Sequence, residues 1–228
     1  MDDLTLPAEP SAIRFDPART ALVIIDMQRD FIEPGGFGET LGNDVGLLRR
    51  AIGPCAAALK AARAAGVMVI HTREGHRPDL SDAPPAKVAR GAPSKRIGDP
   101  GPMGRILVRG EVGHGIIAEL APLGDETVID KPGKGAFHQT DLEQVLRNRG
   151  VEVLMVCGVT TEVCVHTTIR EGNDRGYKCV ALADACASYF PEFHRVGLEM
   201  IKAQSGIFGW VSDSAAFVET LAAARQAA

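Results

Sequence analysis

Residues 21–26 read ALVIID, an aliphatic run rich in β-branched residues that ends in one acidic side chain. Such a run is typical of a strand in a parallel sheet, because helices cover both faces of the sheet and leave no polar side to the strand. Ligands bind where the parallel strands end. The run therefore predicts a central strand over 21–25, with Asp26 at the ligand-binding edge.

Outward from this run, strand and helix patterns alternate along the chain. Further strands are predicted at 67–71, 127–130, 153–157 and 179–183, with a short one near Ile207. Helices are predicted at 44–65 (with a kink or restart at Gly53-Pro54), 140–149 (opened by a capping box), 162–175, 191–203 and from 213 onward. This alternation predicts an α/β fold, a doubly wound, mostly parallel six-stranded sheet with helices on both faces.

The chain is long enough to bury one core, since 45% of its 228 residues are hydrophobic. We expect a single domain over 1–228, in which residues 1–19 form an N-terminal extension. Residues 72–115 are dense in Gly, Pro and Arg and predict a long excursion from the fold. We expect this excursion to form the rim of the site or a subunit contact.

The overall composition limits the kinds of binding partner that we expect. A formal charge of -4 gives no broad basic field, so neither nucleic acid nor an anionic membrane is an expected partner. The first twenty residues lack the apolar core of a signal peptide, and charged residues interrupt every hydrophobic stretch. Five cysteines, an odd number, favour a reducing compartment. We therefore expect a cytoplasmic protein that acts on a small molecule.

Three reactive residues lie at or just after three predicted strands. Asp26 ends the first, Lys131 follows the strand at 127–130, and Cys164 begins the helix after the strand at 153–157. A parallel sheet brings such strand ends together. A helix start and a nearby ammonium both lower a thiol pKa, and a carboxylate can take the thiol proton and return it to a leaving amine. The three residues predict a cysteine nucleophile with an acid–base partner.

Taken singly, these residues also have structural interpretations. Cys164 would be a small buried hydrophobe, Asp26 a loop cap and Lys131 a solvated strand end. A metal site is the competing arrangement, but the six histidines form no HExxH or Asp-x-His pattern, and the cysteines no CxxC pair. We expect neither a metal nor a cofactor. Cys157 lies inside an aliphatic run and is expected to be an inert core thiol.

At these positions the chain resembles the isochorismatase-like cysteine hydrolases. The resemblance runs from about Thr20 to the C-terminal helix through ALVIIDMQRDF (21–31), DKPGKGAFHQTDLE (130–143), GVTTEVCVHTTIREGNDRGY (158–177) and ALADAC (181–186). It implies Asp26, Lys131 and Cys164 as the catalytic triad, with Lys131 and not Lys134 in the catalytic position.

The same resemblance implies several further features. It implies a cis peptide bond at Val159-Thr160 and an oxyanion hole made by the backbone N–H groups of Thr160 and Cys164. It also implies a homo-oligomer, either a dimer or a tetramer. Family members that cleave a vinyl ether lack the cysteine, so Cys164 implies hydrolysis of a C–N bond. The metal cluster of nicotinamidase-like members has no counterpart in this sequence.

Within the family, HTREGHRPDLSD (71–82), IGDPGPMGRILVRGE (97–111) and KPGKGAF (131–137) are most similar to biuret and triuret hydrolases. That likeness implies cleavage of the terminal C–N bond of a small linear carbamoyl-urea, triuret or biuret, with release of ammonia. Ureidoacrylate or another small amide is the alternative substrate. The substrate pocket is then expected to include Phe31, Lys134, Gln204 and Tyr189.

Two functions from other classes stay open at this point. One is a catalytically silent binding protein, because a fold does not fix a function. The other is a redox-sensing protein with a reactive thiol. The presence of Asp26 and Lys131 together with Cys164 favours the enzyme.

Overall fold

A six-stranded parallel sheet forms the centre of the protein, and the computed structural model describes residues 3–227. Its strands lie in the order β10 (Trp210–Ser212), β9 (Lys178–Ala187), β8 (Val153–Val159), β3 (Thr20–Ile25), β4 (Met68–Glu74) and β7 (Thr127–Lys131). Every neighbouring pair is parallel. The predicted fold class is confirmed, with the sheet parallel throughout.

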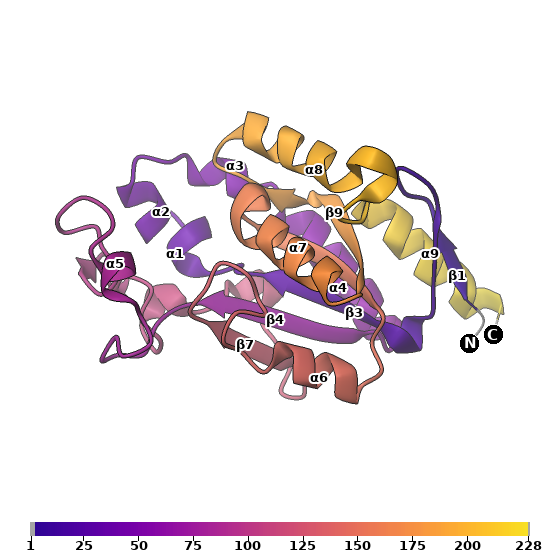
Figure 1. Cartoon of the computed structure of the whole chain (residues 1–228), viewed down its shortest axis with the longest axis horizontal. Helices are drawn as coiled ribbons and strands as arrows, with labels where there is room; N and C mark the ends of the chain where they lie inside the picture. The colour runs from indigo at the N-terminus through magenta and orange to yellow at the C-terminus, as the bar shows by residue number, and fades with distance from the viewer. Residues whose placement is uncertain (1–2, 228) are drawn as a thin grey trace.

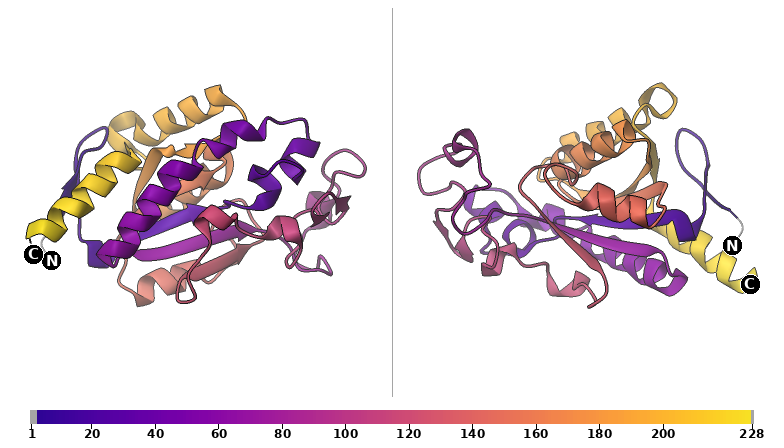
Figure 2. Two further views of the ribbon diagram at one scale, coloured as in Figure 1. Left: turned by 180° about the vertical axis from the view of Figure 1, so that it is seen from behind. Right: turned by 60° about the horizontal axis from the view of Figure 1, so that its bottom comes forward.

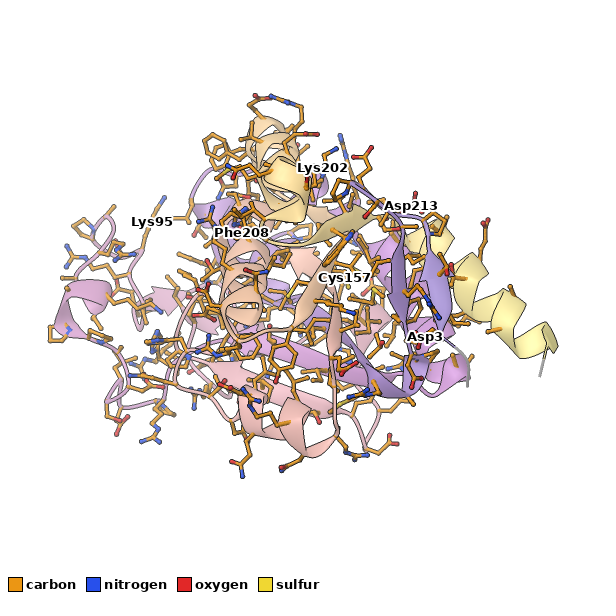
Figure 3. All side chains as sticks on the ribbon, turned by 45° about the vertical axis from the view of Figure 1, so that its right-hand side comes forward. Asp3, Lys95, Cys157, Lys202, Phe208 and Asp213 are labelled. Atoms are coloured by element: carbon orange, nitrogen blue, oxygen red, sulfur yellow. The ribbon has the colours of Figure 1, made fainter. Side chains whose placement is uncertain are left out.

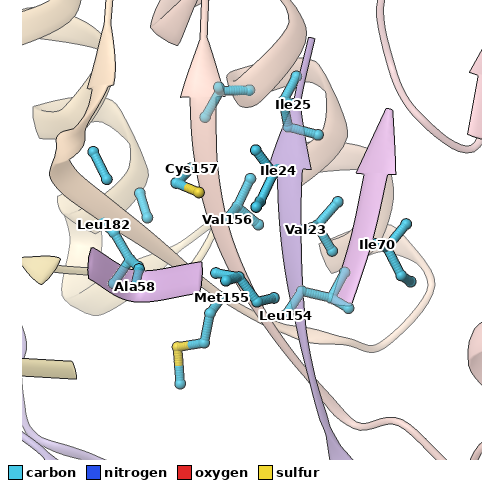
Figure 4. Packing of buried hydrophobic residues seen from close by; sticks show 14 of the residues in the cluster. Val23, Ile24, Ile25, Ala58, Ile70, Leu154, Met155, Val156, Cys157 and Leu182 are labelled. Carbon is cyan, nitrogen blue, oxygen red and sulfur yellow. The ribbon is translucent and has the colours of Figure 1, made fainter. Parts of the chain in front are cut away.

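The first aliphatic run forms a central strand, as predicted. All six residues of β3 are buried, and β3 pairs with β8 on one side and β4 on the other. Figure 4 shows Val23, Ile24 and Ile25 packed beside side chains of β8. Cys157 lies in this core, and neighbouring Cys55 together with burial raises the pKa of its thiol well above the usual value. Its inert core role is thus supported.

Helices cover both faces of the sheet. The helices α4 (Ile52–Ala65) and α9 (Ser214–Ala227) pack together on one face, while α6 (Leu142–Asn148) and α7 (His166–Asp174) lie on the other (Figures 1 and 2). The long helix α8 (Pro191–Gly206) lies beside α7, and Gly197 faces Thr161 and His166. Four shorter helices are α1 (Arg29–Ile32), α2 (Phe37–Thr40), α3 (Val45–Arg49) and α5 (Pro85–Val88). No helix among residues 3–227 is both long enough and apolar enough to cross a bilayer.

The helix predicted over 44–65 restarts at Ile52, next to the predicted restart at Gly53-Pro54, so that Pro54 falls in the first turn of α4, where its missing N–H costs no hydrogen bond. Other element boundaries differ from the prediction. The N-cap of α6 is Asp141, while the Thr140 hydroxyl donates to the carbonyl of Ala136 and accepts from the N–H of Leu142. The last strand is β10, a few residues beyond the exposed Ile207.

The excursion lies at the edge where the parallel strands end, which we call the carboxyl edge (Figure 1). It begins only at Gly75, because residues 72–74 continue β4. Besides α5 it contains a small ribbon of β5 (Pro100–Gly101) and β6 (Gly104–Arg105). Residues 106–108 are buried, although they form no strand of the sheet. Figure 3 shows Lys95 of the excursion projecting outward, whereas Cys157 lies within the body.

The N-terminal residues fold against the opposite end of the molecule. Strands β1 (Leu4–Leu6) and β2 (Ile13–Phe15) form an antiparallel pair, and β1 contacts α9. Leu6 and Phe15 are buried in the main core. The segment before β3 is therefore packed on the parallel sheet's own core.

Gly158 is required where β8 leaves the sheet. Its φ is +112°, and a Cβ atom there would lie 2.1 Å from the carbonyl oxygen of Ile25. We expect Gly158→Ala to lower the free energy of unfolding by at least about 3 kcal/mol, since both the backbone conformation and the contact become unfavourable. Urea denaturation measures this. Gly176→Ala is the matched control, because Gly176 also has a positive φ (+88°) but open space around it. Equal losses in the two variants would contradict the role assigned to the contact with Ile25.

Candidate active site

Asp26 and Lys131 meet at the carboxyl edge, as the sequence predicts. Asp26 directly follows β3, and Lys131 is the last residue of β7, two strands away. The Lys131 Nζ lies 2.7 Å from Asp26 Oδ2, and both side chains are fully buried. A buried ion pair is costly to desolvate, so its presence at a strand edge indicates a functional role.

The position of Asp26 is fixed by its neighbours on β4. Its φ of +49° turns the chain away from β3, and its backbone N–H donates to the carbonyl of Thr72 at 3.2 Å. The Thr72 hydroxyl donates to Asp26 Oδ1 at 2.7 Å. One carboxylate oxygen therefore faces a hydroxyl and the other faces the Lys131 ammonium.

Lys131 is held as an ammonium group. Its Nζ donates to the carbonyls of Gly133 and Lys134 at 3.1 and 2.9 Å. Burial by itself would lower the pKa of Lys131, but Asp26, Cys164 and Glu74 together outweigh burial and raise that pKa above its usual value. The charge of Lys131 is thus available to stabilise an anion at the carboxyl edge.

Cys164 lies in a π-helical turn, Thr161–Val165, which leads from β8 into α7. The backbone of this turn is anchored because Thr168 donates to the carbonyl of Cys164 at 2.7 Å and accepts from the N–H of Ala136 at 3.1 Å. Burial raises the pKa of the Cys164 thiol well above its usual value and outweighs the Lys131 ammonium, which lowers it. The predicted lowering of this pKa is therefore wrong for the resting protein, where Cys164 is a thiol.

Glu74 is a fourth ionisable residue at the site, beside Asp26, Lys131 and Cys164, and it was not predicted from the sequence. The Cys164 thiol donates to Glu74 Oε2, with Sγ and oxygen 3.6 Å apart. Glu74 is the last residue of β4, and its side chain is 1% exposed. The sequence does contain a signal for Glu74, because Glu74, like Asp26, is an acidic residue at the end of a strand. It was overlooked because the prediction ended this strand at His71.

The residues predicted to line the substrate pocket lie in different places. Phe31 and Tyr189 come together at the carboxyl edge, where the Tyr189 hydroxyl donates to the carbonyl of Phe31 at 2.7 Å. Lys134 is 40% exposed, with its Nζ 2.6 Å from Glu74 Oε1. The roles of Phe31, Tyr189 and Lys134 in a substrate pocket stay predictions.

Gln204 is not brought to this cluster within the chain. The helix α8 begins near the carboxyl edge after β9 and runs back toward the other end of the sheet (Figure 1). Gln204 lies exposed at its far end, where the following Gly206 faces Pro10 of the N-terminal segment. Residues 203–205 leave helical geometry at this end of α8, and a role for Gln204 in the substrate pocket stays a prediction.

The backbone before Cys164 has the predicted cis peptide bond, at Val159-Thr160. The Thr160 carbonyl accepts from the N–H groups of Val163 and Val165 at 3.1 and 3.2 Å. Thr160 thus begins the turn that holds Cys164. Its N–H and that of Cys164 remain the predicted oxyanion donors.

One set of potential metal ligands occurs among residues 3–227. Ligand atoms of Asp26, Glu74 and Cys164 lie within 4.8 Å of one another. The ammonium groups of Lys131 and Lys134 already neutralise the two carboxylates, at 2.7 and 2.6 Å. A divalent ion there would face two ammonium groups, so the donor set fits a protein-only site better.

Comparison with known proteins assigns the family. Residues 20–216 match the model described as the isochorismatase domain, and the chain therefore belongs to the isochorismatase family. The ureidoacrylate amidohydrolase RutB of Serratia proteamaculans is 35% identical over 96% of this chain and 90% of its own. RutB of Acinetobacter baylyi is 36% identical, over 94% of this chain and 89% of its own.

The solved structures agree with this assignment. A cysteine hydrolase from Pseudomonas syringae pv. phaseolicola superposes with a TM-score of 0.77 at 32% identity, covering 98% of this chain and 99% of that one.

Proposed function

We propose that this chain is a cysteine-dependent amidohydrolase that cleaves a C–N bond of a small linear carbamoyl compound. The observation that carries the proposal is the fully buried Asp26–Lys131 ion pair, 2.7 Å long, at the same edge as the Cys164 thiol. This is an acid–base group, a fixed cation and a nucleophile in one place. The RutB relatives, which are named as amidohydrolases, support the same reaction.

The geometry gives each residue a role in acyl transfer. Asp26 takes the proton of the Cys164 thiol, and the sulfur attacks the carbonyl carbon of the substrate. The backbone N–H groups of Thr160 and Cys164 bind the resulting oxyanion, each donor contributing about 3 kcal/mol to the transition state. The intermediate collapses, the C–N bond breaks, and Asp26 returns the proton to the leaving nitrogen.

The second half of the reaction regenerates the thiol. Water attacks the thioester-like intermediate, with Asp26 now accepting a proton from the water. The carbon–sulfur bond breaks, and the sulfur leaves and regains a proton as the carboxylic product departs. The Lys131 ammonium keeps Asp26 in place and balances its charge before and after each transfer.

Ureidoacrylate is the first substrate to test, because both RutB relatives bear its name and match almost the whole chain. Biuret and triuret, cleaved at the terminal C–N bond with release of ammonia, are the second candidates. They are supported by the likeness of residues 71–82 and 97–111 to those hydrolases, and by the partly exposed Lys134, which pairs with Glu74. The homo-oligomer and the cytoplasmic location stay predictions.

A substrate panel tests the proposal. Purified protein is incubated with ureidoacrylate, biuret, triuret and nicotinamide, and both substrate loss and ammonia release are measured. We expect one of the first three to exceed nicotinamide in kcat/KM by at least about 100-fold, because a pocket built for a polar ureide rejects a ligand that leaves its polar groups unpaired. Binding of a ureide without turnover would instead identify a silent binding protein. A thiol that reacts with peroxide while all four amides persist would identify a redox sensor.

A further inference from the structure

We propose that Glu74 is a fourth catalytic residue, whose carboxylate holds the Cys164 thiol proton in a hydrogen bond and opposes formation of the thiolate in the free enzyme. The proposal rests on the proposed function, since it takes Cys164 as the nucleophile. Glu74 touches the reacting atom directly, with Oε2 3.6 Å from Sγ. No bond breaks at Glu74, so its effect is on the orientation and charge state of the sulfur.

The backbone of Glu74 is clamped in place by a buried glutamine. The Gln28 side chain accepts from the Glu74 N–H at 2.6 Å and donates to the Glu74 carbonyl at 3.0 Å. Gln28 is fully buried and lies two residues after Asp26. The two carboxylates that face the sulfur are therefore positioned by the same stretch of chain, which is the arrangement a functional pair requires.

The two oxygens of Glu74 have different partners. While Oε2 accepts the thiol hydrogen, Oε1 lies 2.6 Å from the Nζ of Lys134 and 3.5 Å from that of Lys87. Burial alone would raise the pKa of Glu74, but the ammonium groups of Lys134 and Lys131 lower it. Glu74 is thus held as a carboxylate, and its Oε2 accepts the hydrogen bond from the thiol.

Lys87 connects the excursion to Glu74 and its partners. It lies on α5, its side chain is 15% exposed, and its Nζ also donates to the carbonyl of Pro132. Lys87 and Lys134 therefore hold Glu74 from two segments that are outside the sheet. The excursion supplies a charge to the active site as well as a rim.

The charges that face the sulfur predict the direction of the effect. They are the carboxylates of Asp26 after β3 and Glu74 on β4, and the ammonium groups of Lys131 on β7 and Lys134 in the following loop. The ammonium group of Lys87 lies one step further away, beside Glu74. Removing the Glu74 charge leaves one carboxylate and three ammonium groups. An anionic sulfur is then favoured by the net positive surroundings.

The test is the pH profile of Cys164 alkylation by iodoacetamide, followed on the Cys164 peptide by mass spectrometry. We expect Glu74→Gln, which keeps the shape of the side chain, to move the midpoint about one pH unit lower and to speed alkylation near neutral pH about tenfold. Lys87→Met should move the midpoint the other way, because it removes a cation. Opposite shifts would not result from a general loosening of the site.

Glu126→Gln is the matched control. Glu126 is also a largely buried carboxylate in ion pairs, with Arg63 at 2.7 Å and His71 at 3.1 Å, but it lies before β7 at the other end of the sheet. Its variant should keep the wild-type midpoint. An unmoved midpoint in folded Glu74→Gln would overturn the proposal. If that variant does not fold, an unmoved midpoint in Lys87→Met would do so.

This readout needs no substrate, so it separates the two proposals. Shifted midpoints together with an inactive substrate panel would reject the proposed function and keep the assignment of Glu74. An active panel with unshifted midpoints would keep the function and leave Glu74 as structural packing only.

Discussion

Cys164→Ser is expected to lower kcat/KM for the best substrate of the panel by at least about 10³-fold. A serine hydroxyl is a far weaker acid than a thiol, and Asp26, which is paired with Lys131 at 2.7 Å, cannot deprotonate it efficiently. Steady-state ammonia release measures the loss. Intact-mass spectrometry after rapid acid quenching should show an acyl adduct on the wild-type protein and none on the serine variant, if hydrolysis of the intermediate is slow enough for it to accumulate.

Cys157→Ala is the matched control for this experiment. Cys157 is equally buried, but it lies inside β8, where its thiol packs among aliphatic side chains (Figure 4). The control should lose stability through the cavity it creates and still turn over substrate. Wild-type turnover by Cys164→Ser, or equal losses in both variants, would remove Cys164 from the role of nucleophile.

The second large effect concerns the buried ion pair. Asp26→Asn leaves the Lys131 ammonium buried without its counter-ion, and Lys131→Met leaves the Asp26 carboxylate in the same condition. Each single change should lower the free energy of unfolding by about 3–5 kcal/mol. The double variant removes both charges and should recover much of that loss. All three variants should lack turnover, because the acid–base group or its cation is gone.

Urea denaturation and ammonia release, measured on the same preparations, check both halves of this expectation. Arg147→Met breaks an exposed ion pair with Glu143 and serves as the control, with little change in either measurement. A double variant that recovers stability but not turnover separates the catalytic from the structural role of the pair. Turnover by the double variant would show that the pair is only structural.

Much of the fold was readable from the sequence because the buried strands are aliphatic. The run at 21–25 is enclosed on both sides by neighbouring strands and contains no polar residue, so its strand and its end at Asp26 were both predicted. The meeting of Asp26 and Lys131 at one edge followed from the same reasoning, because parallel strands end at one edge. The restart at Ile52 and the C-cap at Gly66 (φ +69°) similarly reflect local backbone chemistry.

The rest depended on contacts that no local pattern contains. Thr72 and Arg73 end the aliphatic pattern of β4, yet Thr72 is buried against Asp26 and Arg73 pairs with Asp130 at 2.6 Å. The strand therefore continues to Glu74. The raised pKa of the Cys164 thiol depends on how deeply the turn is buried, which its sequence does not specify. The role of Gln204 was inferred from the resemblance alone and stays a prediction.

The anchoring of Glu74 by Lys87 has an evolutionary consequence. The sheet and its helices fix Asp26, Lys131 and Cys164, whereas Lys87 arrives on a surface segment that is not part of the sheet. Surface segments tolerate insertion, deletion and exchange far better than core strands do. Selection can thus retune the reactivity of the nucleophile by replacing a loop and leave the folding core unchanged. For directed evolution, residues 85–88 are accordingly a more permissive library than the triad and its strands.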